Sequence, residues 1–457
     1  MKKYINLYLK NANIEIPNVN DVVQDHINLD SLIGFLYFDI EWSLEKESLI
    51  KSLAKKIEIS KKFYSEYTLD WKKNKNAKIA TNLQNSLLAL ALYISFKKLQ
   101  ESNAPPELLF TRMNATLKAL EISKEVWCNS ESILYKDITK DLNSLAEKGP
   151  ISKNSFMNKI SLSIESNNPK EVPITILYSE GPIARAYLEI FKSLNLKPQK
   201  IIEMISSVDV SSRKPIGKFL PQKLRVMYAR YSQESKINFW PRDIKKRNPD
   251  LQSLILNELK DKFNIPYKTL DSTTNKLEIA EYCDNVETIF ISDLKDQKLE
   301  EKLKTHHEDI ILFTGGGIVP SSLLSIVNTR FIHIHPGYLP DVRGADCTLW
   351  SSMIFNKTAA TCFYMSPGID TGDIILSRWM PELSFKIDKK YEYITLYRSV
   401  YSYIDPWIRA LVLREFLENY STFMIEDTIE QKIDDGNTYY FMHERMKKTA
   451  LKYFFSN

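Results

Sequence analysis

The chain has 457 residues, 44% of them hydrophobic and 26% charged, which is typical of a globular protein of two or three domains. Its formal net charge of +5 is too small to indicate nucleic-acid binding by itself. Four scattered cysteines without a CxxC pair argue against a disulfide framework and a structural zinc site, and they favour the reducing cytoplasm.

The N-terminal sequence begins with two lysines but has no continuous apolar stretch, so it predicts no secretory signal. The longest apolar stretch, residues 86–96, is shorter than the about 20 residues that span a bilayer. It predicts a buried helix instead. The expectation is a cytoplasmic protein that makes no contact with a membrane.

Residues 1–150 predict an all-helical N-terminal domain. Gly34 is the only glycine before Gly149, and Pro105 and Pro106 lie near an expected helix start. Apolar residues recur at helical spacing in two stripes: Leu49, Leu53 and Ile57, then Met113, Leu117 and Leu120. Nothing in this segment suggests catalysis. It could serve in packing, in forming a homo-oligomer, or in recognising a substrate.

Residues 151–172 are rich in Ser, Asn, Lys and Pro and predict a linker. The pattern then changes to short apolar runs separated by helix-like segments or by Gly/Pro turns. The runs are 174–179, 200–205, 288–291, 310–313, 331–335, 361–365 and 373–376. Such alternation predicts an α/β domain over 173–419 with a Rossmann-like, doubly wound, mainly parallel sheet.

A long helix is expected within residues 391–419, interrupted near Pro406, and residues 420–457 are expected as a short C-terminal extension. Ligands of doubly wound sheets bind beyond the carboxyl ends of the strands, so the residues that follow each strand matter most. One such segment is TGGGIVP, residues 314–320. Its glycines allow a close approach to a ligand, or simply a tight turn.

The segment HIHPGYLPDVRGAD, residues 333–346, carries two of the six histidines of the chain. His333 and His335 are two residues apart in a strand and therefore share one face. They could form a metal pair or lie on the surface. A zinc site needs three or four ligands and no third one is evident nearby, so no metal is expected.

The segment SPGIDTGDII, residues 366–375, places Asp370 between Gly368 and Gly372 in a turn before a strand. An acid in that position can be a simple turn former. It can also orient a histidine, as carboxylates do in acyl transfer. The residues of this segment alone leave both interpretations open.

Taken in order, GGGIVP, HIHPGYLP, RGAD and GIDTGDII resemble the catalytic domain of folate-dependent formyltransferases. Methionyl-tRNA, glycinamide ribonucleotide and amino-sugar formyltransferases form this family. The clear match covers residues 310–376, and a looser one extends back to residue 174. The resemblance implies a formyltransferase fold for this part of the chain and says nothing about residues 1–150.

The resemblance also implies roles for single residues. His335 matches the catalytic histidine and Asp370 the catalytic aspartate. The asparagine that polarises the formyl oxygen in the family is replaced by His333, which can donate the same hydrogen bond. A changed acyl donor, hydrolysis in place of transfer, and lost activity are the alternatives that this departure leaves open. Residues implied in binding the formyl donor are Gly315, Gly316, Gly317, Ile318, Gly337, Tyr338, Leu339 and Asp373. Residues implied in binding the acceptor are Arg343, Gly344 and Asp346.

The implied function is formyl transfer from 10-formyltetrahydrofolate to the amine of a small anionic acceptor, such as an amino-sugar nucleotide, within one-carbon metabolism. A hydrolase that releases formate and a non-catalytic binding module are the alternatives. Residues 213–247 hold eleven Lys and Arg residues against Glu234 and Asp243. They predict either a solvated helix face or a contact with a phosphorylated acceptor. Little chain remains for a tRNA-binding domain, so nucleic acid is not expected.

Overall fold

The computed structural model describes residues 75–122, 133–147, 169–306, 310–388, 390–420, 423–432 and 435–456. The chain divides into two compact units, Met1–Pro150 with Tyr439–Thr449, and Ile151–Thr438 with Ala450–Asn457. Residues 420–457, expected as one extension, are thus shared between the two units. Most of the expected linker, 151–172, and the stripe Leu49, Leu53 and Ile57 lie outside the described residues.

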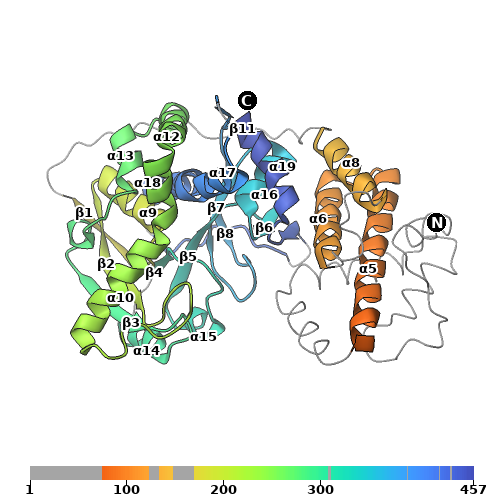
Figure 1. Cartoon of the computed structure of the whole chain (residues 1–457). Coiled ribbons are helices and arrows are strands. Elements are labelled where there is room, and N and C mark those ends of the chain that lie inside the picture. Colours follow the sequence, from red (N-terminus) through yellow and green to blue (C-terminus); the bar gives the residue numbers. More distant parts are fainter. Residues whose placement is uncertain are drawn as a thin grey trace. The chain divides into compact units, whose positions relative to one another are not determined.

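The first unit contains helices α5 (Lys75–Glu101), α6 (Pro106–Ile122) and α8 (Ile133–Glu147) (Figure 1). Helix α6 begins at Pro106, because a proline at the first helical position lacks only an N–H that has no partner there anyway. The expected stripe Met113, Leu117 and Leu120 is buried. The Tyr93 hydroxyl of α5 donates to Asp141 Oδ2 of α8 at 2.7 Å.

The second unit is built on a seven-stranded sheet of order β3-β2-β1-β4-β5-β7-β8. The strands are β1 (Lys170–Tyr178), β2 (Leu196–Ser206), β3 (Val286–Ile291), β4 (Ile310–Phe313), β5 (Arg330–His335), β7 (Ala359–Tyr364) and β8 (Ile374–Trp379). The first five strands in this order, β3 to β5, are parallel to one another, and only β7 is reversed, because it runs antiparallel to both of its neighbours, β5 and β8. The predicted mainly parallel α/β fold is confirmed.

Helices connect and cover the strands. They are α9 (Pro182–Ser193), α10 (Gln222–Ile237), α11 (Phe239–Arg247), α12 (Pro249–Phe263), α13 (Tyr267–Ser272), η2 (Ile279–Glu281), α14 (Gln297–His306), α15 (Ser321–Leu324), α16 (Cys347–Phe355), α17 (Tyr393–Ser399), η3 (Val400–Ile404) and α18 (Asp405–Asn419). Helix α19 (Glu444–Phe454) is divided between the two units after Thr449. Shorter strands are β6 (Val342–Gly344), β9 (Phe385–Lys386), β10 (Asn437–Tyr439) and β11 (Phe455–Ser456).

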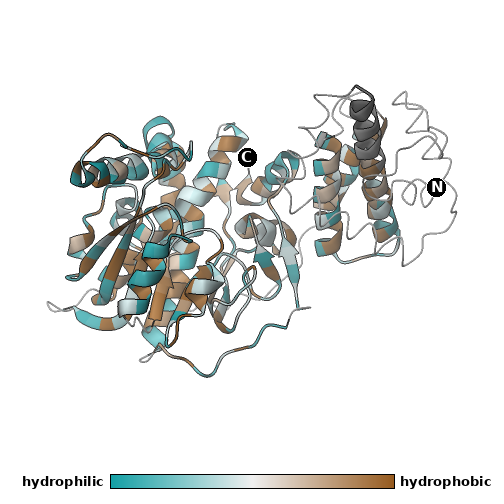
Figure 2. Cartoon of the chain, turned by 90° about the horizontal axis from the view of Figure 1, so that it is seen from below, coloured by the Kyte–Doolittle hydropathy of each residue, from teal (hydrophilic) through white to brown (hydrophobic). Residues whose placement is uncertain are grey.

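The core of the second unit lies against the strands, which are mostly hydrophobic in Figure 2. On one face, Leu303 of α14 and Leu323 of α15 join Leu177, Ile311 and Phe331 of the sheet in one buried cluster. Helices α9 and α18 pack against each other and against strands of the sheet. Burial of this apolar area is the main force that fixes the strand order.

Several boundaries differ from the predicted ones. Strands β1 and β2 begin four residues before the apolar runs, at Lys170 and Leu196. The early start of β1 is not visible as an apolar run, because its first two residues are exposed and polar. The helix expected over residues 391–419 is interrupted near Pro406, as predicted. The interruption is the π-helical turn η3, which ends two residues before Pro406. Among the described residues, no helix has the length and apolarity that crossing a membrane requires.

Successive strands are added to the sheet first on one side of β1 and then, from β4 on, on its other side. From β1 the chain moves outward through β2 to the edge strand β3, and then it returns to β4 on the other side of β1. The connections after β1 and β4 therefore diverge and leave an opening at their carboxyl ends. The segments after β1, β4 and β5 meet at this edge.

Candidate active site

The glycine-rich segment after β4, residues 314–320, lies at this carboxyl edge of the sheet. The Ser179 backbone N–H, after β1, donates to Thr314 Oγ1 at 2.9 Å, which ties the two strand ends together. A Cβ on Gly315 would lie 2.8 Å from the Phe313 ring, so this position requires glycine. Gly316 and Gly317 are exposed and have open space around them. This segment is therefore open to a ligand, as expected for the donor-binding role.

His335 ends β5 and is buried, with 2% of its surface exposed. Its Nδ1 lies 3.3 Å from Asp370 Oδ2, and its Nε2 lies 3.0 Å from the Val342 carbonyl oxygen. The structure brings the two predicted residues, His335 and Asp370, together. A neutral imidazole has one N–H for these two acceptors, whereas a protonated ring can donate to both.

Asp370 lies in the turn between β7 and β8, in a left-handed conformation with φ of 50°. Its Oδ2 accepts the Gly344 backbone N–H at 2.9 Å, in addition to facing His335. Burial alone would raise the pKa of Asp370, but the facing His335 ring and the Gly344 N–H lower it to about 2. The carboxyl group is therefore ionised at neutral pH.

Gly372 and Gln431 hold the Asp370 turn in place. Gly372 has φ of +114°, and a Cβ there would lie 2.1 Å from the Tyr364 carbonyl oxygen. Gln431 Nε2 donates to the carbonyl oxygens of Gly372 at 2.6 Å and Asp370 at 3.2 Å. The turn is thus fixed by its own backbone and by a side chain about 60 residues further along the chain.

Gly372→Ala should lower the free energy of unfolding by about 2–4 kcal/mol, because it adds backbone strain to a clash with a carbonyl group. Gly316→Ala is the matched control, since an added Cβ meets nothing within 4 Å there. It should change stability by less than about 0.5 kcal/mol. Urea unfolding of both variants checks the difference, and equal stabilities would contradict the described turn.

His333 lies on the same face of β5, between the rings of Phe313 and Phe363. Its Nδ1 is 3.0 Å from the Phe313 carbonyl oxygen, and a carbonyl can only accept, so Nδ1 carries the proton. Burial and nearby Arg409 lower the pKa of His333 to about 4, so the ring is neutral at pH 7. No N–H is left for a formyl oxygen. The predicted donor role is corrected: Nε2 is an acceptor.

The lowered pKa of His333 predicts how stability depends on pH. Between about pH 6.5 and pH 4 the unfolded chain binds a proton here that the folded chain does not. The free energy of unfolding should therefore fall as the pH falls through this window, by up to roughly 3 kcal/mol. His443, whose pKa is also lowered to about 4, adds to this slope.

His333→Asn should remove the His333 part of this pH dependence and leave the part due to His443. Urea unfolding of both proteins between pH 4 and pH 7 measures it. An NMR titration of the His333 ring gives an independent value. A midpoint above pH 6 would contradict the neutral, buried ring.

The loop after β5 is close-packed. A Cβ on Gly337 would lie 2.3 Å from the Val342 carbonyl oxygen and 2.8 Å from His335 Nε2, so only glycine lets the loop close over the ring. Tyr338 stacks on Trp379, with ring centroids 4.9 Å apart. Leu339 is 1% exposed and lies in a core cluster with Phe363 and Ile374. Its expected contact with a formyl donor is therefore corrected to a packing role.

The residues expected to bind the acceptor, Arg343, Gly344 and Asp346, have different surroundings. Asp346 Oδ1 accepts from the Tyr401 hydroxyl at 2.7 Å and the Tyr397 hydroxyl at 3.3 Å, so this carboxylate anchors η3 and α17. The Gly344 backbone N–H donates a hydrogen bond to Asp370 Oδ2. Arg343 is buried and lines a pocket beside the Asp370 turn.

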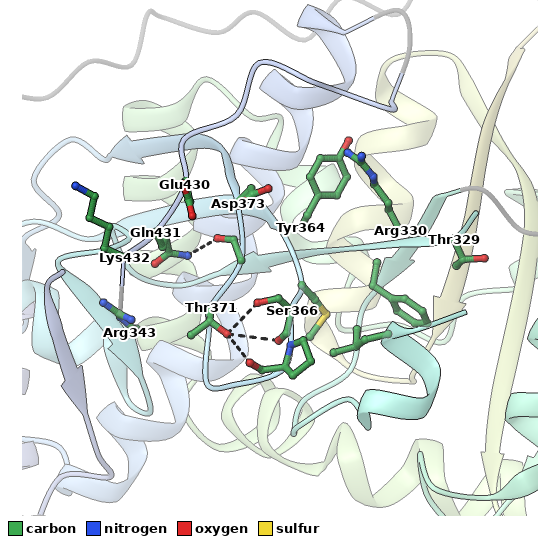
Figure 3. A pocket seen from close by; sticks show the side chains of 15 residues that line it. Thr329, Arg330, Arg343, Tyr364, Ser366, Thr371, Asp373, Glu430, Gln431 and Lys432 are labelled. Atoms are coloured by element: carbon green, nitrogen blue, oxygen red, sulfur yellow. Dashed lines mark hydrogen bonds between the residues drawn. The ribbon is translucent and has the colours of Figure 1, made fainter. Parts of the chain in front are cut away.

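This pocket has a volume of about 530 Å³ and runs along the segment after β7 (Figure 3). Its walls come from the start of β5, the end of β7, residues 366–373 and residues 430–432. Asp373 lines it, as expected for a ligand-binding residue. The sequence did not indicate Arg330, Gln431 or Lys432, because they lie far along the chain from the motifs and belong to none of them.

Part of this site matches a known family model. Residues 256–400 match the model described as formyl transferase, a range that begins in α12 and includes β5, His335 and Asp370. This part of the chain is therefore similar to formyl transferases. The expected resemblance is confirmed for this region.

Among curated proteins, part of the chain is similar to methionyl-tRNA formyltransferases. The one from Clostridioides difficile (strain 630) is 37% identical over 86 residues, which are 18% of this chain and 27% of that protein. The one from Ehrlichia canis (strain Jake) is 34% identical over 99 residues, 21% of this chain and 33% of that protein. The chain thus spans a third or less of the length of these relatives.

One similar solved structure is that of phosphoribosylglycinamide formyltransferase from Streptococcus pneumoniae TIGR4. The two sequences are 14% identical, the match covers 55% of this chain and 99% of that chain, and the TM-score is 0.27. Another is the formyltransferase PseJ from Anoxybacillus kamchatkensis, in complex with UDP-4,6-dideoxy-4-formamido-L-AltNAc and tetrahydrofolate. Its sequence is 22% identical to this one, the match covers 34% of this chain and 74% of the PseJ chain, and the TM-score is 0.25. The family assignment rests on the family model and the curated relatives.

The basic segment 213–247 precedes the formyl transferase match, and much of its charge is used within the fold. Arg230 pairs with Glu203, and Lys245 pairs with Asp271 at 2.8 Å. Lys236 and Arg242 also pair with carboxylates, Asp209 and Glu234. These pairs favour the structural interpretation for the paired residues. Within the described ranges, no three His, Cys, Asp or Glu residues are grouped as metal ligands.

Proposed function

We propose that the formyl transferase domain transfers a formyl group from 10-formyltetrahydrofolate to the amine of a small anionic acceptor, such as an amino-sugar nucleotide. One observation carries the proposal. The buried His335 faces the ionised Asp370 at the carboxyl edge of the sheet, within the residues that match the family. Such a pair is suited to proton transfer during attack on a carbonyl carbon.

The chemistry needs a base, because the attacking amine loses a proton when it bonds to the formyl carbon. His335 is the base in this proposal. When its neutral ring takes up the proton, both nitrogens carry an N–H, and both face acceptors, Asp370 and Val342. The negative Asp370 stabilises the charged ring at the moment it forms. The proton then passes to the departing folate nitrogen.

A second candidate is hydrolysis, in which water replaces the amine and formate is released. The orientation of His333 favours it, because a neutral ring with Nε2 as an acceptor can position a water molecule. A donor at this position would instead have polarised the formyl oxygen. Both candidates use His335 and Asp370 in the same way.

Quantifying tetrahydrofolate and formate after incubation with 10-formyltetrahydrofolate distinguishes formyl transfer from hydrolysis. Transfer predicts that tetrahydrofolate forms only when an amine acceptor is added and that free formate does not accumulate. Hydrolysis predicts equal amounts of formate and tetrahydrofolate without any amine. If the folded protein forms neither product with a panel of amino-sugar nucleotides and phosphorylated amines, both proposals are wrong.

A further inference from the structure

The proposed transfer requires a hydrogen-bond donor for the formyl oxygen, because negative charge develops there as the amine attacks. His333 cannot be this donor, since its only N–H faces the Phe313 carbonyl oxygen. His335 is already assigned as the base. The donor must therefore come from another part of the fold, and helix α18 supplies one in Arg409.

Arg409 reaches the end of β5 from α18. Its Nη1 donates to the Ile334 carbonyl oxygen at 3.1 Å, between the two histidines of the site. The Phe331 carbonyl accepts the Met365 N–H on the β7 side, so the carbonyls of Ile332 and Ile334 face the other side, toward β4. The pairs between β4 and β5 end at Ile332. The guanidinium group therefore takes the place that a further residue of β4 would have had, at the carboxyl edge of the sheet.

A buried network fixes the orientation of Arg409. Its Nε donates to Asp405 Oδ2 at 2.9 Å, and the other oxygen of Asp405 accepts from the Thr348 hydroxyl at 2.5 Å. Asp405 is 1% exposed, so this ion pair is shielded from solvent. A guanidinium group is planar and rigid, so holding two of its nitrogens also fixes the direction of the third. A donor that is oriented before the charge develops needs no rearrangement during the reaction.

The third nitrogen of Arg409 is free. Nη2 has no hydrogen-bond partner among the described residues, and it is not fully enclosed, since 12% of the side-chain surface is exposed. The positive charge also acts on the site. Burial lowers the pKa of His333 most and the Arg409 charge next, whereas the charge of Asp370 acts in the opposite direction. The guanidinium group is thus near enough to influence the ring beside the reacting pair.

We propose that Arg409 is a catalytic residue of this site and that its Nη2 donates a hydrogen bond to the formyl oxygen during the reaction. When the amine nitrogen bonds to the formyl carbon, an electron pair of the C=O bond moves onto the oxygen. Arg409 stabilises that charge and keeps its own proton, while His335 takes the proton of the amine. The C=O bond forms again as the bond from carbon to the folate nitrogen breaks. The inference rests on the proposed function and gives the role indicated for His333 to a residue outside the motifs.

Kinetics of the full chain test the role. Arg409→Met combined with Asp405→Asn removes every N–H of the guanidinium group without leaving an unpaired buried charge. It should lower the turnover number about 10²- to 10³-fold and change the KM for the formyl donor less than about threefold. Arg409→Lys keeps the charge but has a single nitrogen for three partners, so its loss should be smaller.

Arg414→Met combined with Glu418→Gln is the matched control. Arg414 is another buried arginine of α18, and it pairs with Glu418 one helical turn away, toward the other end of the helix. The control should keep the turnover number within about threefold of the wild type. It reproduces the loss of a buried ion pair of α18 and leaves the Ile334 carbonyl contact in place.

Infrared spectroscopy of bound 10-formylfolate, a stable form of the donor, tests the contact itself without turnover. A ¹³C label identifies the formyl band, and a hydrogen bond from a guanidinium group lowers its stretching frequency. The frequency should be lower in the wild type and in the Arg414 control than in the Arg409→Met, Asp405→Asn protein. If that protein does not fold, Arg409→Lys carries the test, and its band should also lie above that of the wild type.

Equal band positions in the wild type and a folded Arg409 variant overturn the proposal, even if turnover is lost, because Arg409 would then only hold the end of β5. Wild-type turnover in the folded double variant overturns it as well. A wild type that shows the lowered band but transfers no formyl group contradicts the proposed function alone. A wild type that does not bind 10-formylfolate contradicts both.

Discussion

His335→Ala should lower the turnover number by about 10²- to 10⁴-fold, the usual contribution of a general base. The substitution removes the only buried imidazole among the described residues that faces an ionised carboxylate at the carboxyl edge of the sheet. The KM for the formyl donor should change much less, because the charged ring forms only as the reaction proceeds. Steady-state kinetics with saturating amine acceptor measures both parameters.

His443→Ala is a suitable control. His443 is also a mostly buried histidine near a carboxylate, at 3.2 Å from Glu121, but it belongs to the helical unit. Its loss should leave the turnover number within about threefold of the wild type. A His335→Ala protein that is folded and keeps its turnover within the same range would remove His335 from the chemistry.

Asp370→Asn should lower turnover by about 10²- to 10³-fold, with the size of the side chain retained. The amide cannot offset the positive charge of His335, so uptake of the proton becomes less favourable. Asp427→Asn is the control, because Asp427 is an aspartate of the same unit that is exposed to solvent and lies outside the Asp370 turn. It should change turnover less than about twofold.

The pKa of Asp370 also sets the sign of a pH effect. Because this pKa is lowered to about 2, ionised Asp370 stabilises the fold above about pH 4, and the stabilisation is lost as the pH falls toward 2. Asp370→Asn should remove this part of the acid dependence of unfolding. Equal turnover in the Asp370→Asn and Asp427→Asn proteins would contradict the assigned pair.

The apolar runs predicted the strands of a mainly parallel sheet, and the glycines predicted a turn at Asp370. The pairing of His335 with Asp370 was implied by the family resemblance. It did not follow from the carboxyl ends of the strands, because β7, which precedes Asp370, runs antiparallel to β5. The start of β1 could not be predicted, because Lys170 and Glu171 pair with a neighbouring strand although they are exposed and polar.

Other details depend on contacts between residues far apart in the chain. The tautomer of His333 follows from the Phe313 carbonyl group, 20 residues earlier, and no sequence pattern specifies that carbonyl. Asp346 is engaged by Tyr397 and Tyr401, more than 50 residues later. Gln431 reaches the Asp370 turn from a segment that carries no motif. Only the packed fold reveals these partners.

The central claim is that formyl transfer occurs at His335 and Asp370, and following the formyl carbon tests it most directly. 10-Formyltetrahydrofolate labelled with ¹³C in the formyl group is incubated with the full chain and an amino-sugar nucleotide, and ¹³C NMR follows the label. The account predicts that the label moves to a formamide of the acceptor with the wild type and stays on the folate with His335→Ala. Equal movement of the label with both proteins, or retention on the folate by a wild type that binds donor and acceptor, would contradict it.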